Sequence, residues 1–368
     1  MTAEATSADG PRGELWAARR VGLGLAESVL GAGMLLVPPV TAGLAGDDAP
    51  AAWLITLLIG AGFSACLGLV ARALSEKRES IFDVVGATLG GRVRRVVLAT
   101  YLAGFVIGQG AIAVAAGGFL AYGLGQPEHA YLLGALVLAS ATAASTGGVV
   151  LGDRGRRLRL AVTGAIALAC CALPQVFTAP ALLIPDPNWF GGALFVVLFA
   201  GVGWESSARI APGLADGRTV IRGVAMGAGL VLTGYLLLVV VLSQRLPAAR
   251  TDSSAVRGLA VLAAAVLVVY CVTNIAAAAR FMHALGGPGG RVARTGVGAA
   301  GVAVVAIAAM PGWTVTGLLA GPSLATWLSY LLAMFGGACS LASGRVRGAC
   351  VAVAALLLVV GASTIRSI

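Results

Sequence analysis

Charged side chains are scarce in this chain. Only 11% of its 368 residues are Asp, Glu, Lys or Arg, whereas soluble domains contain roughly a quarter. A water-soluble fold could not cover its surface with so few charges, but a protein whose surface faces lipid can. Hydrophobic residues make up 59% of the chain. They form long unbroken runs and not the alternating stretches of about ten residues that are typical of a transmembrane barrel. The composition predicts an all-α integral membrane protein.

The residues that enzymes use for chemistry are also few. The chain has only two histidines, His129 and His283, and none of its six cysteines has the CxxC spacing of a zinc site. It contains no glycine-rich phosphate loop ending in Lys-Ser or Lys-Thr, so ATP hydrolysis is not expected. We therefore expect neither an enzyme nor a bound cofactor or metal.

Eleven apolar segments have the length of about 20 residues that a membrane-spanning helix needs. They lie at 20–44, 51–73, 96–122, 130–151, 160–182, 190–211, 220–243, 256–281, 295–311, 315–341 and 348–365. The sequence thus predicts about eleven transmembrane helices. The polar stretch 75–95 cannot span, and two interpretations stay open for it: an amphipathic or re-entrant segment on the inner side, or a solvated loop.

The net charge of +10 does not indicate nucleic-acid binding, because the basic residues lie in short loops between apolar runs. With the N-terminus placed inside, 21 of the 25 Lys and Arg residues fall on the inner side. The outer ones are Arg245, Arg250, Arg257 and Arg366. Because basic residues accumulate in cytoplasmic loops, we expect a multi-pass protein of a bacterial inner membrane. Its tail at 1–19 would be cytoplasmic and its C-terminus outside.

Two segments contain helix-weakening motifs at corresponding places. The first carries Gly31-Ala-Gly33 followed by Pro38, and the sixth carries Gly201-Val-Gly203 followed by Pro212. An unwound stretch at membrane depth is tolerated where it lines a cavity, and it offers free backbone groups to a ligand. The spacing predicts two inverted repeats, at 20–182 and 190–341, and an extra span at 348–368. The alternative is that the small residues only allow close helix packing.

Few polar residues lie within the apolar segments. Glu27 and Glu205 are the only acids there, and each flanks a predicted break. Because a buried acid is costly in a membrane, each could carry a coupled proton, or could simply bond the loose backbone. Gln109, Thr273 and Asn274 could line the substrate path or hold helices together. Phe199 could close over the substrate or be an ordinary apolar contact.

These residues resemble the amino acid–polyamine–organocation (APC) superfamily. The run from Gly31 to Pro38 follows the family's first-span pattern G-[SA]-G-h-h-x-x-P, where h is apolar. The sixth span has an aromatic residue, Phe199, and then Gly203-Trp-Glu-Ser206, ahead of a loop with the basic Arg218. In the eighth span, the run from Thr273-Asn274 to Phe281 resembles the methionine and branched-chain efflux permeases.

The resemblance implies a five-plus-five inverted repeat with alternating access, and a substrate held by the backbone of 31–34 and 200–204. The implied substrate-binding residues are Gly31, Ala32, Gly33, Met34, Phe199, Ala200, Gly201, Gly203 and Trp204. In some relatives the acid that matches Glu205 takes part in proton coupling. The fifth span lacks the lysine that some relatives use and has only Arg157 and Arg159 at its start, so no fifth-span base is expected.

The function expected from the sequence is secondary active transport of a small neutral amino acid. Proton linkage is expected, and efflux is favoured over uptake on the resemblance alone. The partners would be the amino acid, protons and the lipid bilayer, with no nucleic acid. The alternative is a polytopic membrane sensor or scaffold subunit that transports nothing.

Overall fold

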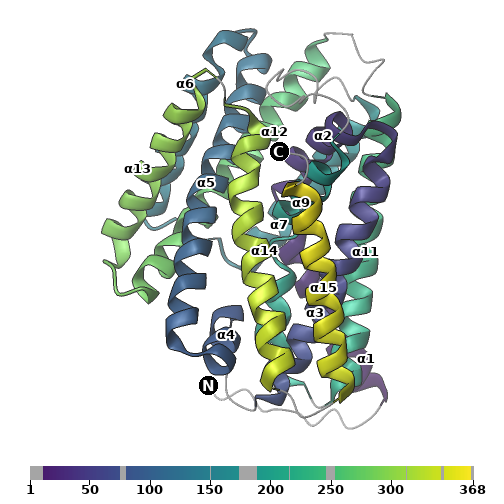
Figure 1. Ribbon diagram of the computed structural model, residues 1–368. Coiled ribbons are helices and arrows are strands. Elements are labelled where there is room, and N and C mark those ends of the chain that lie inside the picture. The colour runs from purple at the N-terminus through teal and green to yellow at the C-terminus, as the bar shows by residue number, and fades with distance from the viewer. Residues whose placement is uncertain are drawn as a thin grey trace.

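The computed structural model describes residues 11–74, 80–149, 151–173, 189–214, 216–245, 253–311, 313–340 and 344–365. In these ranges the chain forms helices and no strand. The α-helices are α1 (Pro11–Val29), α2 (Gly33–Ala45), α3 (Ala49–Ala73), α4 (Ile81–Leu89), α5 (Gly91–Gly123), α6 (Ala130–Thr146), α7 (Asp153–Ala172), α9 (Phe190–Ala200), α10 (Ser207–Ile210), α11 (Gly217–Arg245), α12 (Ser254–Ala284), α13 (Gly290–Ala308), α14 (Val315–Ser340) and α15 (Gly344–Ile365). They form one helical bundle, as Figure 1 shows.

The all-α membrane fold is confirmed, but the predicted count of eleven spans is not. Each predicted segment contains a helix. Among the described residues, however, eight helical stretches are long and apolar enough to cross a membrane, or nine if α9 and its continuation count as one span. One of these stretches, Gly33–Ala73, contains both α2 and α3. Helix α7 is not among them, since its first two turns are rich in arginine. Residues 174–182 of the predicted fifth span lie outside the described ranges.

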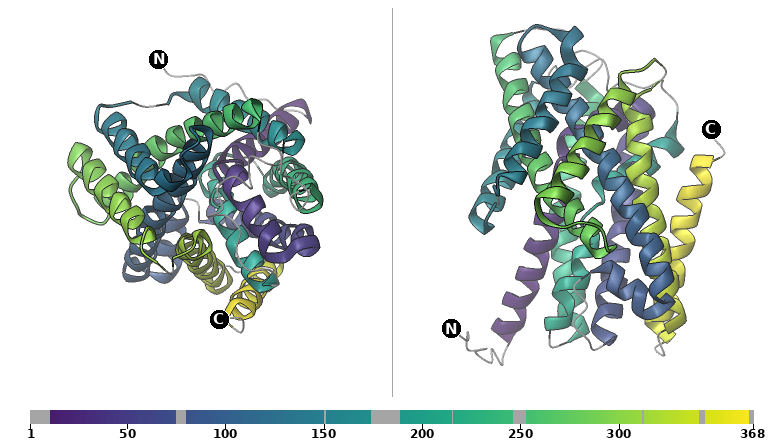
Figure 2. Two further views of the ribbon diagram at one scale, coloured as in Figure 1. Left: turned by 90° about the horizontal axis from the view of Figure 1, so that it is seen from above. Right: turned by 90° about the vertical axis from the view of Figure 1, so that its left-hand side faces the viewer.

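The two ends of the described chain lie at different heights of the bundle. In Figure 2, α1 starts at the bottom of the right-hand view and α15 runs from the bottom into the upper half. The inward orientation of the first end stays a prediction. The predicted tail at 1–19 is partly helical, because α1 already begins at Pro11, and residues 1–10 are not described.

The polar stretch 75–95 contains the short helix α4, which supports the amphipathic interpretation over a plain loop. The Ser80 hydroxyl accepts a hydrogen bond from the Asp83 amide at 3.2 Å and so caps the start of the helix. Gly90, with φ of 92°, ends it. The apolar side chains Ile81, Phe82, Val84 and Val85 are buried. Helix α4 packs against α5 and α14, at the same end of the bundle as the start of α1 (Figure 1).

Both predicted interruptions are present. Helix α1 ends at Val29 and α2 begins at Gly33, so Leu30–Ala32 are not helical. The axis of α9 is bent by 41° from that of the segment Trp204–Ile210. In the first break the glycines have the main effect, since Pro38 and Pro39 both lie inside the continuous helix α2. The division into two inverted repeats remains a prediction.

Candidate substrate site

The two breaks touch each other in the middle of the bundle. Gly33 lies so close to the second break that a Cβ atom placed on it would be 3.0 Å from the Ala200 Cα. Gly203 has φ of 125°, which side chains other than glycine rarely adopt. A Cβ atom there would collide with the carbonyl oxygen of Ser28 at the end of α1. Glycine is therefore required at position 203, and at position 33 a larger residue would press on the second break.

The first break leaves backbone donors unused. The carbonyl oxygens of Gly31 and Ala32 accept hydrogen bonds from Met34 and Leu35, both at 3.0 Å. In the described part of the chain, no hydrogen bond from the N–H groups of Ala32 and Gly33 is found. These groups stand at the start of α2, where the helix dipole is positive. A helix start with open N–H groups suits a carboxylate.

The second break is largely filled by side chains. The Gly201 carbonyl accepts a hydrogen bond from the Tyr330 hydroxyl at 2.8 Å. The Gly203 N–H donates to Glu205 Oε2 at 2.8 Å. The same carboxylate accepts from the hydroxyls of Tyr101 at 2.7 Å and Tyr330 at 2.6 Å. Glu205 therefore bonds the loose backbone of the break, as the structural alternative expected, and a coupling role for it stays a prediction.

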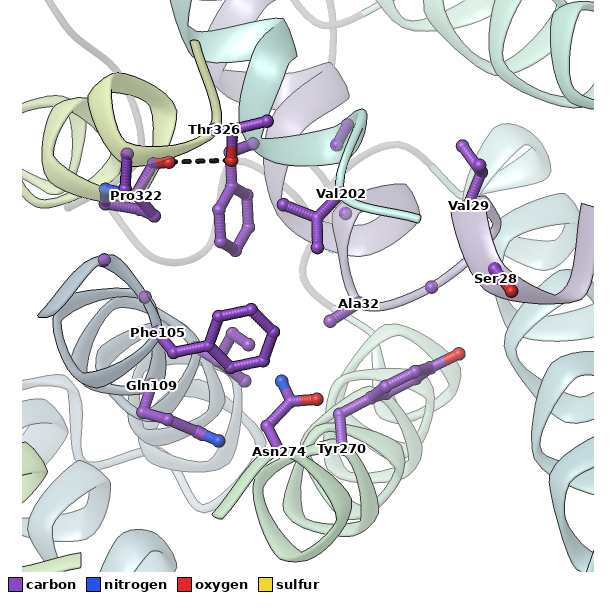
Figure 3. Close-up of a pocket in the computed structure, with 18 of the residues that line it drawn as sticks. Ser28, Val29, Ala32, Phe105, Gln109, Val202, Tyr270, Asn274, Pro322 and Thr326 are labelled. Carbon is purple, nitrogen blue, oxygen red and sulfur yellow. Dashed lines mark hydrogen bonds between the residues drawn. The ribbon is translucent and has the colours of Figure 1, made fainter. Parts of the chain in front are cut away.

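An open cavity lies beside the two breaks, with an empty volume of about 770 Å³ that includes open solvent, and Figure 3 shows part of its lining. Eight of the residues singled out in the sequence line it: Glu27, Gly31, Ala32, Gly33, Gln109, Phe199, Ala200 and Asn274. Six do not: Met34, Gly201, Gly203, Trp204, Glu205 and Thr273. The structure thus brings together the centre of the first break, the end of α9 and the polar residues of α5 and α12.

The six residues outside the lining have other surroundings. Met34 is buried in the first turn of α2. Trp204 is 1% exposed, and its indole ring lies on Gly60 of α3, where a Cβ atom would collide with it. Thr273 faces α7, where it accepts a hydrogen bond from Arg159 at 2.9 Å. Trp204 therefore holds the second break against α3.

Several lining residues were not found by sequence reasoning. Arg159 reaches the cavity from the start of α7, with its guanidinium carbon 4.2 Å from the centre of the Tyr270 ring. From α5, Tyr101 and Phe105 also line the cavity. Gly104 and Gly108 share that face of α5, and a Cβ atom on Gly108 would lie 3.1 Å from the Phe199 ring. The helical spacing of these α5 residues was a signal that could have revealed them.

The cavity is more open on the side of α1 than on the side of α2. The Glu27 side chain is 39% exposed and lies 3.6 Å from Arg157, which is 74% exposed. The opposite half is closed: Trp53 donates to Thr41 at 2.7 Å, and the Trp189 amide donates to the Leu44 carbonyl at 2.9 Å. The second bond joins the end of α2 to the start of α9. The partly exposed Glu27 therefore marks α1 as the more accessible side of the cavity.

Comparisons with known proteins show the fold. The sequence matches no protein-family model and no curated protein. Among solved structures it is similar to MhsT in complex with L-phenylalanine, with a TM-score of 0.60 and 14% identity over 94% of this chain and 98% of that one. It is also similar to a mutant of the Eremococcus coleocola manganese transporter, with a TM-score of 0.55 and 12% identity over 94% of this chain and 85% of that one. The same transporter in complex with an aromatic bis-isothiourea substituted compound gives a TM-score of 0.53 and 13% identity over 94% of this chain and 85% of that one. At such identities the likeness shows the fold alone, and that fold is shared with membrane transporters.

Proposed function

We propose that this protein is a secondary active transporter of small neutral amino acids that works by alternating access. The observation that carries the proposal is the cavity at the first break, where the Ala32 and Gly33 N–H groups are open. A substrate carboxylate would accept from these groups. The residues proposed to bind it are those of the two breaks that line the cavity. The resemblance to the APC superfamily, and to its efflux permeases, supports the same class.

The fold itself does not choose between an amino acid and a metal ion, since one neighbour was solved with L-phenylalanine and another is a manganese transporter. The lining favours the organic substrate. Mn²⁺ prefers several oxygen ligands, above all carboxylates. Among the described residues, no group of three or more His, Cys, Asp or Glu side chains could hold a metal ion. Glu27 is the cavity's one carboxylate among them, and Arg157 already faces it.

The direction of access follows from the proposed orientation. If the arginine-rich end of the bundle is cytoplasmic, in a bacterial inner membrane, the cavity opens inward and the outer side is closed. Export of a substrate then begins from this state. Glu205 and Glu27 are the residues proposed for proton coupling, and Glu205 would act through Tyr101, which separates it from the cavity.

Counterflow in proteoliposomes tests the proposal, with a panel of labelled amino acids at several pH values. The matched variants are Ala32→Pro and Ala32→Ser. Ala32 has φ of −54°, which proline can adopt, so Ala32→Pro removes one N–H group with little backbone strain of its own. We expect Ala32→Pro to lose counterflow at least tenfold and Ala32→Ser to keep it. If no amino acid exchanges and none raises the melting temperature, the non-transporting alternative is favoured.

A further inference from the structure

Two amide side chains stand on the cavity wall that faces the first break. Figure 3 shows Asn274 of α12 pointing into the cavity between Phe105 and Tyr270, with Gln109 of α5 beside it and Ala32 across from it. Gln109 bonds the neighbouring helix α12 through one end of its amide only. In the described ranges, no hydrogen bond to the Asn274 side chain is found.

Gln109 is fixed with one half of its amide unused. Its Nε2 donates to the Cys271 carbonyl at 3.3 Å, which sets the plane of the group. Its Oε1 is buried without a partner in the described structure, in a side chain that is 1% exposed. A buried polar atom without a partner costs free energy, and native proteins rarely leave one unmatched. Together the two amides offer donors and acceptors to a molecule in the cavity.

The charged side chains of the lining are only partly engaged. Arg159 donates to Thr273 and stacks over Tyr270, with its Nε left without a partner among the described residues, and Glu27 faces Arg157. Around the amides, the cavity is lined by the apolar side chains Phe105, Ile112 and Phe199. Such a wall suits a short side chain with a neutral hydrogen-bonding end and an apolar stem, and it matches neither a bare charge nor a purely apolar side chain.

Building on the proposed function, we propose that Asn274 and Gln109 form a side-chain subsite that selects amino acids with a hydroxyl or carboxamide group, such as threonine, serine and asparagine. The carboxylate lies at the Ala32 and Gly33 N–H groups, and the side chain extends to the amides. A site built to hydrogen-bond its substrate discriminates against an isostere that lacks the group, because the protein's amides are then left unpaired.

The test uses isosteric pairs of competitors in counterflow: threonine against valine, and asparagine against leucine. In the wild type, we expect the polar member of each pair to compete at least tenfold better. In Asn274→Leu, the two members of each pair should compete to within about twofold of each other, because the polar member competes less well than in the wild type. Gln109→Met should act in the same direction, and it serves as the second variant if Asn274→Leu folds poorly. Thr326→Val is the matched control, since the Thr326 hydroxyl already donates to the Pro322 carbonyl at 2.9 Å.

Two results would overturn the subsite. One is a wild-type preference for valine and leucine, or ratios that neither amide variant changes. The other is a preference for aspartate and glutamate that Arg159→Gln abolishes, since the charge of Arg159 and not the two amides would then recognise the substrate side chain. Exchange of amino acids with a preference for valine and leucine contradicts the subsite but leaves the transporter proposal standing. Absence of exchange with every amino acid contradicts both.

Discussion

Gly203→Ala tests whether the second break is held against α1. Gly203 has φ of 125° and ψ of −21°, a conformation that costs a residue with a Cβ atom about 1–3 kcal/mol. The new methyl group would also collide with the Ser28 carbonyl and lie 2.8 Å from the Val29 amide. Cβ atoms essentially never approach that closely, so the end of α1 has to move. Because both atoms that meet the methyl group belong to backbone, no side-chain rotation relieves the contact.

Strain and displacement together predict a loss of about 2–4 kcal/mol in unfolding free energy, or a fall of roughly 3–5 °C in melting temperature for a chain of this length. The purified protein in detergent is followed by thermal unfolding, and the reconstituted protein by counterflow. We expect counterflow to fall at least tenfold, because displacing α1 also displaces the free N–H groups of the first break.

Gly229→Ala is the matched control for this experiment. Gly229 lies within α11, and a Cβ atom there would meet nothing within 4 Å. Alanine is the better helix former, so the melting temperature should stay the same or rise. If Gly203→Ala keeps the wild-type melting temperature and counterflow, α1 does not lie against the second break, and the reasoning about a shared cavity is refuted.

Three further predictions concern the surroundings of the breaks. Glu205→Gln should flatten the pH dependence of counterflow in proteoliposomes, and an unchanged pH profile would argue against coupling at that position. Gly60→Ala should lower the melting temperature by an amount equivalent to about 1–3 kcal/mol, because the methyl group collides with the buried Trp204 ring. The control Gly62→Ala should be nearly neutral, since the nearest atom to a Cβ there is a valine methyl at 3.4 Å; equal effects would contradict the packing described. Glu27→Gln removes a partly exposed ion pair and should change stability by less than about 1 kcal/mol in denaturant unfolding, so a loss above about 2 kcal/mol would show that the pair is closed off from solvent.

Helix positions and the two breaks were predictable from the sequence because they depend on local chemistry. Long apolar runs mark helices in a membrane protein, and glycines weaken them wherever they stand. The same local reasoning overestimated the effect of the prolines: Pro38 and Pro39 lie inside α2, which is buried along nearly all of its length. A transmembrane helix tolerates proline when packing re-satisfies its backbone. Composition marks where a helix is weak, and tertiary packing decides where it opens.

The cavity lining was less predictable because it depends on which helix faces which. Arg159 was expected to stand at the inner end of the fifth span, as a loop charge. In the structure its long side chain extends to Tyr270 and Thr273 on α12, and its charged group reaches the lining. A hydropathy pattern places the Cα atom of an arginine and not its charged end. Tyr101 was missed for a related reason: its partner Glu205 is 104 residues away in the chain.

The two breaks look alike in sequence, but their backbone groups differ in how many hydrogen-bond partners they have in the structure. At the first, the N–H groups of Ala32 and Gly33 have no partner among the described residues, and they border the cavity. At the second, Glu205 and Tyr330 already bond the backbone of Gly201 and Gly203. A ligand gains most where donors are unmatched, since it then displaces no existing protein bond. The carboxylate is therefore expected at the first break. The Tyr330 hydroxyl has one proton and two acceptors, at 2.8 and 2.6 Å, so its bonds to the second break and to Glu205 compete. A change at Glu205 therefore alters the hydrogen bond that the Gly201 carbonyl accepts from Tyr330, directly beside the cavity wall.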